Sequence, residues 1–230
     1  MLSYLTSLFR NPRETLIFVL LAFPGRLLAI AAHEFAHAWV ADKCGDPTAR
    51  QLGRLTMNPF KHLDPLGTVM MLLLGFGWAK PVPVNPRNYR NYRRDDLKVS
   101  LAGICMNLIL FLLSNLILCF LSLQMQLHGM GGRLIGYIYE MFQYFMLVNI
   151  SLAVFNLIPL PPLDGYHVLN DLLLRRPLFA TRKAERTADM ILLVLMFSGV
   201  LGRGLSIVVN AAVNGCAQVF FAFFDLIGLF

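Results

Sequence analysis

The chain has 230 residues, of which 57% are hydrophobic and 14% are charged, and its formal net charge is +7. A soluble domain carries roughly 25% charged residues, so this deficit and a mean hydropathy of +0.62 exclude an ordinary soluble protein. The positive charge lies between apolar segments, in 85–98 and 173–186, which is typical of juxtamembrane loops rather than of a nucleic-acid-binding surface. We therefore expect a multi-pass protein of the cell membrane that contacts the lipid bilayer and no nucleic acid.

Six apolar segments follow one another along the chain, at about 15–43, 66–78, 99–123, 134–160, 187–202 and 204–227. A helix needs roughly 20 residues to cross the hydrocarbon, so the first, third, fourth and last are long enough. The second is short, which leaves open whether it crosses or is partly re-entrant. The sequence predicts an all-α polytopic membrane protein with about six membrane helices, in a range of four to six, as a single domain over residues 1–230.

The connecting segments carry two further signals. The loops 79–98 and 163–186 are both basic, whereas 124–132 carries only His128, so two crossings between them place both basic loops on the cytoplasmic side. The glycines in 199–204 predict a tight turn between two hairpinned helices.

Residues 77–92 form neither a spanning helix nor an ordinary linker. Prolines at 81, 83 and 86 forbid a helix and favour extended backbone, with Val82 and Val84 on one face. We expect a short extended or re-entrant segment at the membrane boundary. Two interpretations stay open: an interfacial loop anchored by Trp78, and an edge that faces a substrate.

Residues 33–37 read His-Glu-Phe-Ala-His, an H-E-x-x-H pattern inside the alanine-rich first segment. On a helix, residues four apart share a face, so His33 and His37 can bind one ion. Glu34 lies beside that face, placed to take a proton from a water whose pKa zinc lowers to about 7. The alternative is a pair of core histidines that match by chance. A bound cation is favoured because uncompensated ionisable groups are expensive inside a membrane.

A catalytic zinc site takes three protein ligands and keeps one position open for water. Spacing alone leaves four candidates for the third ligand: His62, Asp64, Asp164 and His167. The first two are also typical of solvated turn residues. Asp164 follows three prolines that break a hydrophobic helix, which is how membrane proteins expose a ligand at depth. Its alternative role is the N-cap of a helix over 165–174.

Two motifs far apart in the chain carry a family resemblance. His-Glu-Phe-Ala-His is one, and Asn-Leu-Ile-Pro-Leu-Pro-Pro-Leu-Asp-Gly at 156–165 is the other. Together with matches at 58–69 and 77–90 in the same order, they make the chain resemble the site-2 protease family of intramembrane zinc metalloproteases. It looks most like the small form without PDZ or CBS domains, and the resemblance covers about residues 27–175.

The resemblance implies one zinc ion per chain, held by His33, His37 and Asp164, with Glu34 as the catalytic base. Asn156 falls where the family's asparagine is thought to hold the substrate or the developing oxyanion. An interhelical hydrogen bond is its alternative role. The implied substrate is a transmembrane or membrane-anchored protein, cleaved in or next to its membrane segment, and a homo-oligomer stays open.

Two departures from the family pattern leave roles unassigned. Gly103 and Asn107 match the family's Gly-Pro-x-x-Asn without the proline, and Gly103 is interpreted as small-residue packing. His167 stands near a position where a second glycine is common, and we favour a role other than ligand. The first helix is predicted to end at Gly45. Small residues on that helix are expected to admit the proline-broken segment: Ala29, Ala32, Ala36 and Ala41.

Two rival functions remain at this point. A catalytically silent metal-binding scaffold does not need the carboxylate of Glu34. A metal transporter needs more intramembrane acidic or histidine residues along a path, for which Asp225 and Glu140 are thin support. We further hypothesise that the segment around Val82 and Val84 pairs with an unwound stretch of substrate.

Overall fold

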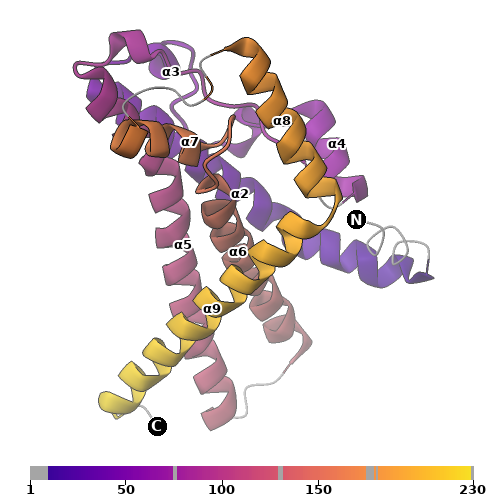
Figure 1. Ribbon diagram of the computed structural model, residues 1–230. Coiled ribbons are helices and arrows are strands. Elements are labelled where there is room, and N and C mark those ends of the chain that lie inside the picture. The colour runs from indigo at the N-terminus through magenta and orange to yellow at the C-terminus, as the bar shows by residue number, and fades with distance from the viewer. Residues whose placement is uncertain (1–9, 75–76, 129–131, 175–178, 180, 229–230) are drawn as a thin grey trace.

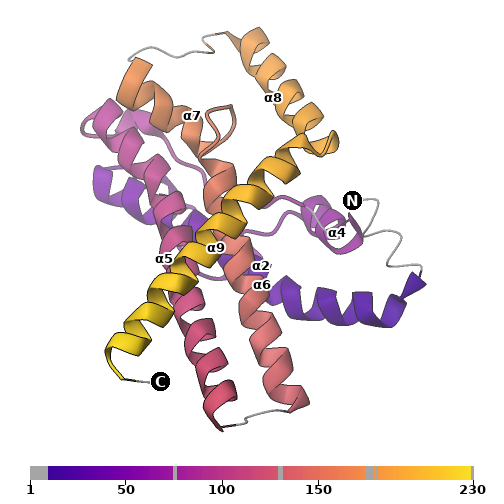
Figure 2. The same cartoon turned by 60° about the horizontal axis from the view of Figure 1, so that its bottom comes forward.

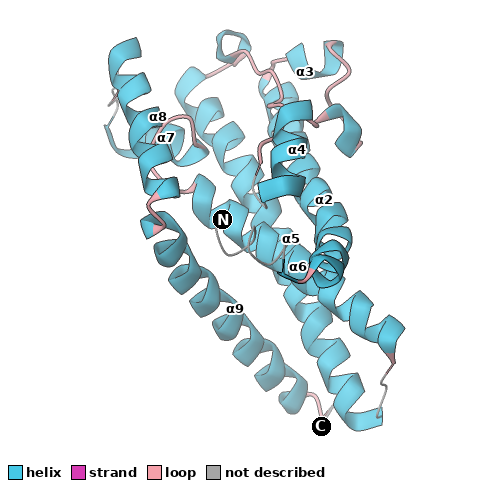
Figure 3. Cartoon of the chain, turned by 90° about the vertical axis from the view of Figure 1, so that its right-hand side faces the viewer, coloured by secondary structure: helices cyan, strands magenta, loops and turns pink. Residues whose placement is uncertain are grey.

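The computed structural model describes residues 10–74, 77–128, 132–174, 179 and 181–228. Regular structure in these residues is helical (Figure 3), and the extended backbone shows one isolated bridge, between Leu63 and Ala79. The elements in chain order are α2 (Pro12–Cys44), α3 (Thr48–Gln51), η1 (Pro59–Lys61), α4 (Pro65–Leu74), η2 (Pro86–Asn88), α5 (Tyr92–His128), α6 (Arg133–Asn156), α7 (Asp164–Leu169), the π-helical turn η3 (Asn170–Leu174), α8 (Arg182–Phe197) and α9 (Val200–Leu226). The all-α expectation is confirmed.

Four of the described helices are long and apolar enough to cross a membrane: α2, α5, α6 and α9. They coincide with the four segments whose length predicts a crossing. The other two apolar segments form α4, with 10 residues, and α8, with 16 residues, which are too short to span. Among the described residues, the number of helices long enough to span is therefore at the lower end of the expected four to six.

The spanning helices form one bundle. α5 and α6 run side by side, α2 crosses both on one side, and α9 crosses them on the other (Figures 1 and 2). Among the described residues, the largest cluster of buried apolar side chains in the bundle joins α5, α6 and α9 through Phe111, Leu118, Met146, Ile150 and Val209. Because lipid tails are as apolar as these side chains, close van der Waals packing rather than exclusion of water holds the helices together.

Small residues let α2 pack tightly against α5. Ala29 and Ala41 are fully buried. Ala41 packs with Val99 of α5, and the carbonyl of Ala29 accepts a hydrogen bond from Asn107 of α5. At Ala29 and Ala41 the neighbouring element is therefore α5, while the expectation that Ala32 and Ala36 admit the proline-broken segment stays a prediction.

The ends of α2 and α9 follow local backbone rules. α2 ends at Cys44 because Gly45 takes the left-handed conformation, with φ of 109°, and caps the last carbonyls, as the sequence predicts. The turn before α9 is shorter than predicted. The turn consists of Ser198 and Gly199, which has a φ of 75°, and α9 begins at Val200. Gly202 and Gly204 therefore lie inside the helix.

The segment between α4 and α5 is extended and tied at both ends. Near its start, the Lys80 N–H donates to the His62 carbonyl at 2.8 Å. Near its end, Asp46 accepts hydrogen bonds from the Asn85 N–H at 2.6 Å and from the Asn88 side chain at 2.8 Å. These ties hold the stretch around Val82 across the end of α2.

Trp78 lies against the first turn of α4. A Cβ on Gly67 would lie 2.1 Å from the Trp78 carbonyl oxygen, so only glycine allows this approach. With 10 residues, α4 is too short to cross a membrane.

The break after α6 positions α7. α6 ends at Asn156, prolines occupy the next turns, and α7 begins at Asp164, at the end of the bundle where α3 and the loops gather (Figure 1). A Cβ on Gly165 would lie 2.4 Å from the Leu157 carbonyl oxygen. Glycine at this position therefore lets α7 fold back onto the end of α6. Asp164 is the first residue of α7 and Leu163 is its N-cap, so the N-cap role for Asp164 is wrong.

Candidate metal centre

Three ligand atoms from two distant parts of the chain meet at one point. His33 and His37 lie one turn apart on α2, and Asp164 begins α7. The two Nε2 atoms are 2.9 Å apart, and Asp164 Oδ2 lies 3.3 Å from each of them. Within the described chain this is the group of three histidine or acidic ligands compact enough to hold a metal ion.

The other ring nitrogens of both histidines are already engaged. His33 Nδ1 lies 2.6 Å from Asn107 Oδ1, and His37 Nδ1 lies 2.7 Å from the Val99 carbonyl oxygen. Both partners are acceptors, so each Nδ1 carries the hydrogen. Each Nε2 then points a lone pair into the site, which is the form of histidine that binds a metal.

With both hydrogens on Nδ1, none of the three facing ligand atoms carries a hydrogen that it could donate to another. Two nitrogen lone pairs face each other, and the buried Oδ2 of Asp164 makes no hydrogen bond. An ionised carboxylate and two lone pairs repel one another unless a cation lies between them.

The spacing of these atoms fits a small tetrahedral cation. Bonds of 2.0–2.1 Å at the tetrahedral angle separate two ligand atoms by about 3.3 Å. The two distances to Asp164 equal this value, and the distance between the histidines is somewhat shorter. The space is kept open by Gly103 of α5. A Cβ there would lie 2.4 Å from His37 Nε2 and 2.7 Å from His33 Nε2.

Glu34 lies beside this cluster without joining it. Its Oε2 accepts a hydrogen bond of 2.7 Å from the Val82 N–H, in the extended segment before α5. The contact turns the carboxylate toward the same cavity that the ligands face, and it leaves the second oxygen available. Val82 itself is buried, so the extended segment forms one wall of the site.

A cavity of about 350 Å³ opens over the ligands. Besides the three ligands and Glu34, its walls include Val82, Val84, Asp96, Asn156 and His167. Asn156 borders the cavity, and its Nδ2 donates to the Leu152 carbonyl of its own helix at 3.0 Å. The interhelical hydrogen bond considered for Asn156 is therefore absent among the described residues. One amide oxygen and the second amide hydrogen remain for a ligand.

The other candidates for the third ligand have different contacts. His62 is buried, and its Nε2 lies 2.8 Å from the Thr56 carbonyl. Asp64 accepts a hydrogen bond from the Gly67 N–H at 2.8 Å and caps α4. Neither joins the metal-ligand group.

His167 faces the cavity but pairs with a carboxylate. Its Nδ1 lies 3.0 Å from Asp96 Oδ2, and this hydrogen bond, working against burial, raises the pKa of the imidazole. Its nonligand role, favoured from sequence, agrees with this contact.

Sequence reasoning missed two residues around the centre. Gly103 is interpreted there as helix packing, but it borders the histidine rings directly. Asn149 is not considered at all, yet it is fully buried and bonded to Asn107. The available signal is spacing for Gly103, because Gly103 and Asn107 lie four residues apart and so share one face of α5. For Asn149 the only sequence signal is that an amide side chain inside a membrane-spanning helix is energetically costly.

Comparison with known proteins identifies the family of this chain. A protein of Bacillus subtilis named "Putative zinc metalloprotease YwhC" is 39% identical over 205 residues, which is 86% of this chain and 90% of that protein. The chain belongs to peptidase family M50. The profile "Peptidase family M50" itself matches residues 131–199, which include the motif at 156–165. The family resemblance read from the sequence is thereby confirmed, and the enzyme class is metalloendopeptidase.

Mycobacterial M50 relatives extend the comparison. "Putative zinc metalloprotease Rip2" of Mycolicibacterium smegmatis is 29% identical over 190 residues, covering 80% of this chain and 69% of that protein. The protein of the same name in Mycobacterium tuberculosis is 30% identical over 183 residues, covering 77% and 66%. No solved structure matches the chain.

Proposed function

We propose that this M50 peptidase is an intramembrane zinc protease of the cell membrane. It hydrolyses a peptide bond in or next to a transmembrane segment of a membrane-protein substrate, with one zinc ion per chain held by His33, His37 and Asp164. The observation that carries the proposal is the meeting of two Nε2 lone pairs and an unpaired carboxylate oxygen beside Glu34, in a cavity among membrane-spanning helices.

The donor set matches zinc chemistry. Two imidazoles and one carboxylate leave the fourth tetrahedral position open, which is the composition of catalytic rather than structural zinc sites. Zinc, when bound there, lowers the pKa of water to about 7 and polarises the scissile carbonyl. The Nδ1 contacts to Asn107 and Val99 orient the two imidazoles for this role.

Glu34 moves the proton. Its free carboxylate oxygen accepts a proton from the attacking water and delivers it to the leaving amine. The hydrogen bond from the Val82 N–H holds the carboxylate beside the site during both transfers. Asn156 can turn its amide N–H toward the oxyanion, and a donor of this kind stabilises the transition state by about 3 kcal/mol.

The substrate must present its backbone as an extended strand, because a peptide bond inside a helix is shielded. The wall formed by the extended segment suits such a strand, and we propose that the two pair through main-chain hydrogen bonds. The Val82 N–H is already bonded to Glu34, whereas the Val84 N–H has no partner among the described residues. Val84 also lines the cavity, so its main chain is the pairing group.

The purified wild-type protein and two variants test the mechanism in liposomes that contain a fluorogenic transmembrane peptide. Glu34→Gln keeps the ligands, so it should bind one zinc ion and lose cleavage by at least about 100-fold. His33→Ala should lose both zinc and cleavage. Full cleavage by Glu34→Gln would contradict the proposed mechanism. A cavity that transports metal instead would show zinc flux into the liposomes without peptide cleavage, and a silent scaffold would show neither.

A further inference from the structure

A line of buried amides runs from His33 on α2 through α5 to α6. Asn107 on α5 and Asn149 on α6 are both 0% exposed, and each lies in a membrane-spanning helix. Asn107 Oδ1 lies 2.6 Å from His33 Nδ1, and Asn107 Nδ2 donates to Asn149 Oδ1 at 2.8 Å. Asn149 Nδ2 in turn donates to the Phe145 carbonyl at 2.8 Å. A polar side chain at such a depth is costly, so this line calls for a function.

The Phe145 carbonyl fixes which group donates and which accepts in every hydrogen bond of this line. The Phe145 carbonyl only accepts, so the NH₂ end of Asn149 must face it. The oxygen of Asn149 then faces Asn107, which requires the NH₂ end of Asn107 on that side. The oxygen of Asn107 is left facing His33, and His33 must carry its hydrogen on Nδ1.

The two histidines therefore obtain the same tautomer in different ways. His37 Nδ1 contacts the Val99 carbonyl, a backbone acceptor that cannot turn around. His33 Nδ1 contacts a side-chain amide, whose oxygen and nitrogen exchange places when it rotates by half a turn. An amide in that position needs a lock, and Asn107 has two: the Ala29 carbonyl at 3.2 Å and Asn149 at 2.8 Å.

We propose that Asn149 is a positioning residue of the metal centre, which acts through Asn107 to keep the Nε2 lone pair of His33 in the site. The inference rests on the proposed function, because it assigns a role toward the metal that His33 binds. Asn149 touches neither metal nor substrate in this role. Its hydrogen bond to Phe145 lies within one helix, so that bond orients the amide and adds nothing to helix association.

Asn115 provides a matched control on the same helix as Asn107. It is buried, and its Nδ2 donates to the Val213 carbonyl of α9 at 3.4 Å, away from the histidines. Replacing it by leucine removes a buried amide and an interhelical hydrogen bond without touching the line to His33. A general loosening of the bundle would affect both sites alike.

The test measures zinc affinity of the full-length protein in detergent, by competition with a chromogenic chelator. Outer-shell partners of zinc ligands contribute about 10- to 100-fold in metal affinity. Asn107→Leu should weaken zinc binding toward the upper value and Asn149→Leu toward the lower, because the Ala29 carbonyl still holds Asn107 in the second variant. Asn115→Leu should stay within about 2-fold of the wild type, as expected for a site that shares no partners with the centre.

A double variant distinguishes loss of the Asn107 amide orientation from a general loss of helix packing. In Asn107→Asp either carboxylate oxygen can accept from His33, so there is no amide orientation left to lock. Adding Asn149→Leu to Asn107→Asp should then leave zinc affinity unchanged or improved. If Asn149→Leu weakens binding by the same factor in both backgrounds, or no more than Asn115→Leu does, the proposal is wrong. Should Asn149→Leu not accumulate, Asn149→Ser shortens the side chain and serves the same comparison.

A second readout does not depend on zinc. With ¹⁵N-labelled histidine, NMR of the metal-free protein reports which nitrogen of each ring carries the hydrogen. His33 should be protonated on Nδ1 in the wild type and become a mixture in Asn149→Leu, whereas His37 should not change. An unchanged His33 would overturn the role of Asn149. Equal zinc affinity of the wild type and His33→Ala would instead overturn the proposed metal centre, so the two failures are distinct.

Discussion

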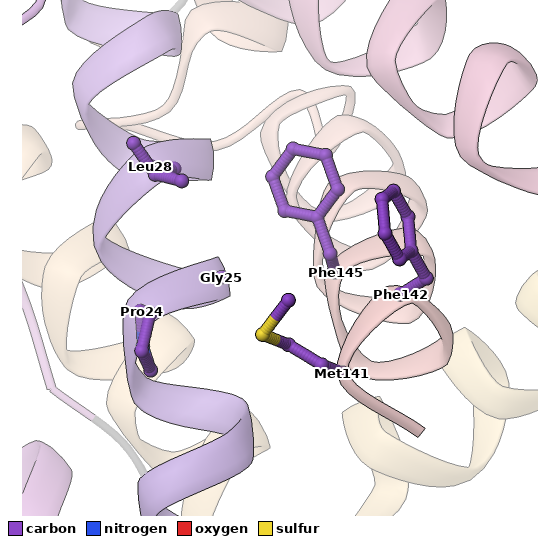
Figure 4. A pocket seen from close by; sticks show the side chains of 6 residues that line it. All are labelled: Pro24, Gly25, Leu28, Met141, Phe142 and Phe145. Atoms are coloured by element: carbon purple, nitrogen blue, oxygen red, sulfur yellow. The ribbon is translucent and has the colours of Figure 1, made fainter. Parts of the chain in front are cut away.

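Helix α2 borders two cavities of opposite character, less than two turns apart. The first, of about 210 Å³, lies between α2 and α6 (Figure 4). Its walls come from Pro24, Gly25 and Leu28 on one helix and from Met141, Phe142 and Phe145 on the other. The second is the cavity of about 350 Å³ over His33, His37 and Asp164. One membrane-spanning helix therefore lines both an apolar and a polar cavity.

The contrast shows what a membrane-spanning helix demands of polar residues. The apolar cavity is bounded by side chains that need no partner, and its lining is held by van der Waals contact alone. Around the polar cavity, each Nδ1 and the Glu34 carboxylate has a named partner, and the atoms without hydrogen bonds converge on one point. At the polar cavity, the unpaired carboxylate oxygen of Asp164 and the two Nε2 lone pairs thus face the place where the proposed cation would bind.

Glycine-to-alanine changes should have the largest effect of the variants considered at one cavity and a small effect at the other. A Cβ at Gly103 would lie 2.4 Å from His37 Nε2, whereas a Cβ at Gly25 would lie 3.3 Å from Phe145 Cβ. Gly103→Ala should therefore lose zinc and reduce cleavage by at least about 100-fold, since it disturbs both imidazoles. Gly25→Ala should keep one zinc ion and change the free energy of unfolding by about 1 kcal/mol or less. The zinc content and the peptide cleavage rate of both variants are measured. A Gly103→Ala protein that binds a full equivalent of zinc would contradict the proposal that Gly103 leaves the space for the metal.

The wall of the polar cavity offers a second, smaller test. Val84→Pro removes the N–H proposed to pair with substrate and keeps the extended backbone, while Val84→Ala keeps the N–H and shortens the side chain. We expect Val84→Pro to lower kcat/KM by about 10-fold, corresponding to a net hydrogen bond of about 1.4 kcal/mol, with zinc content unchanged. Val84→Ala should stay closer to the wild type. Equal kinetics of the two variants would argue against strand pairing at this residue.

Asp46, which anchors that wall, should affect the stability of the fold rather than cleavage, and its effect should depend on pH. Burial acts to raise the pKa of Asp46, but hydrogen bonds from Asn85, Thr48 and Asn88 outweigh burial and lower it. Because the pKa is lowered in the folded protein, the stabilisation is present above the unfolded value of about 3.9 and is lost as pH falls through the folded value.

Asp46→Asn should consequently lower the free energy of unfolding at pH 7 by about 1–2 kcal/mol. The gap between variant and wild type should narrow below about pH 4. Thermal unfolding in detergent at several pH values measures it, and the difference between the two proteins cancels the titration of the shared histidines. A gap that is constant down to pH 3 would mean that the charge of Asp46 does not hold the segment.

Much of the centre could be predicted from sequence because its spacing is local. His33 and His37 lie four residues apart in a segment that can only be helical, so helix geometry alone makes them neighbours. The four spans follow from length and hydropathy, and the break after Asn156 follows from its prolines. Such rules act within one element and need no knowledge of its partners.

The rest depends on how the helices meet. Four residues were equal candidates for the third ligand by spacing, and only the return of α7 onto the end of α6, permitted by Gly165, brings Asp164 to the histidines. The close approach of α5 likewise makes Gly103 a wall of the site and Asn107 a partner of His33. The sequence by itself determined the spanning helices and the positions of two proposed ligands and the proposed catalytic carboxylate, because these are periodic or contiguous. Tertiary structure decided which candidate residue meets the two histidines, which acceptor faces His33 Nδ1 and which segment forms the wall over Glu34, because contacts between residues more than 40 positions apart depend on which helix faces pack.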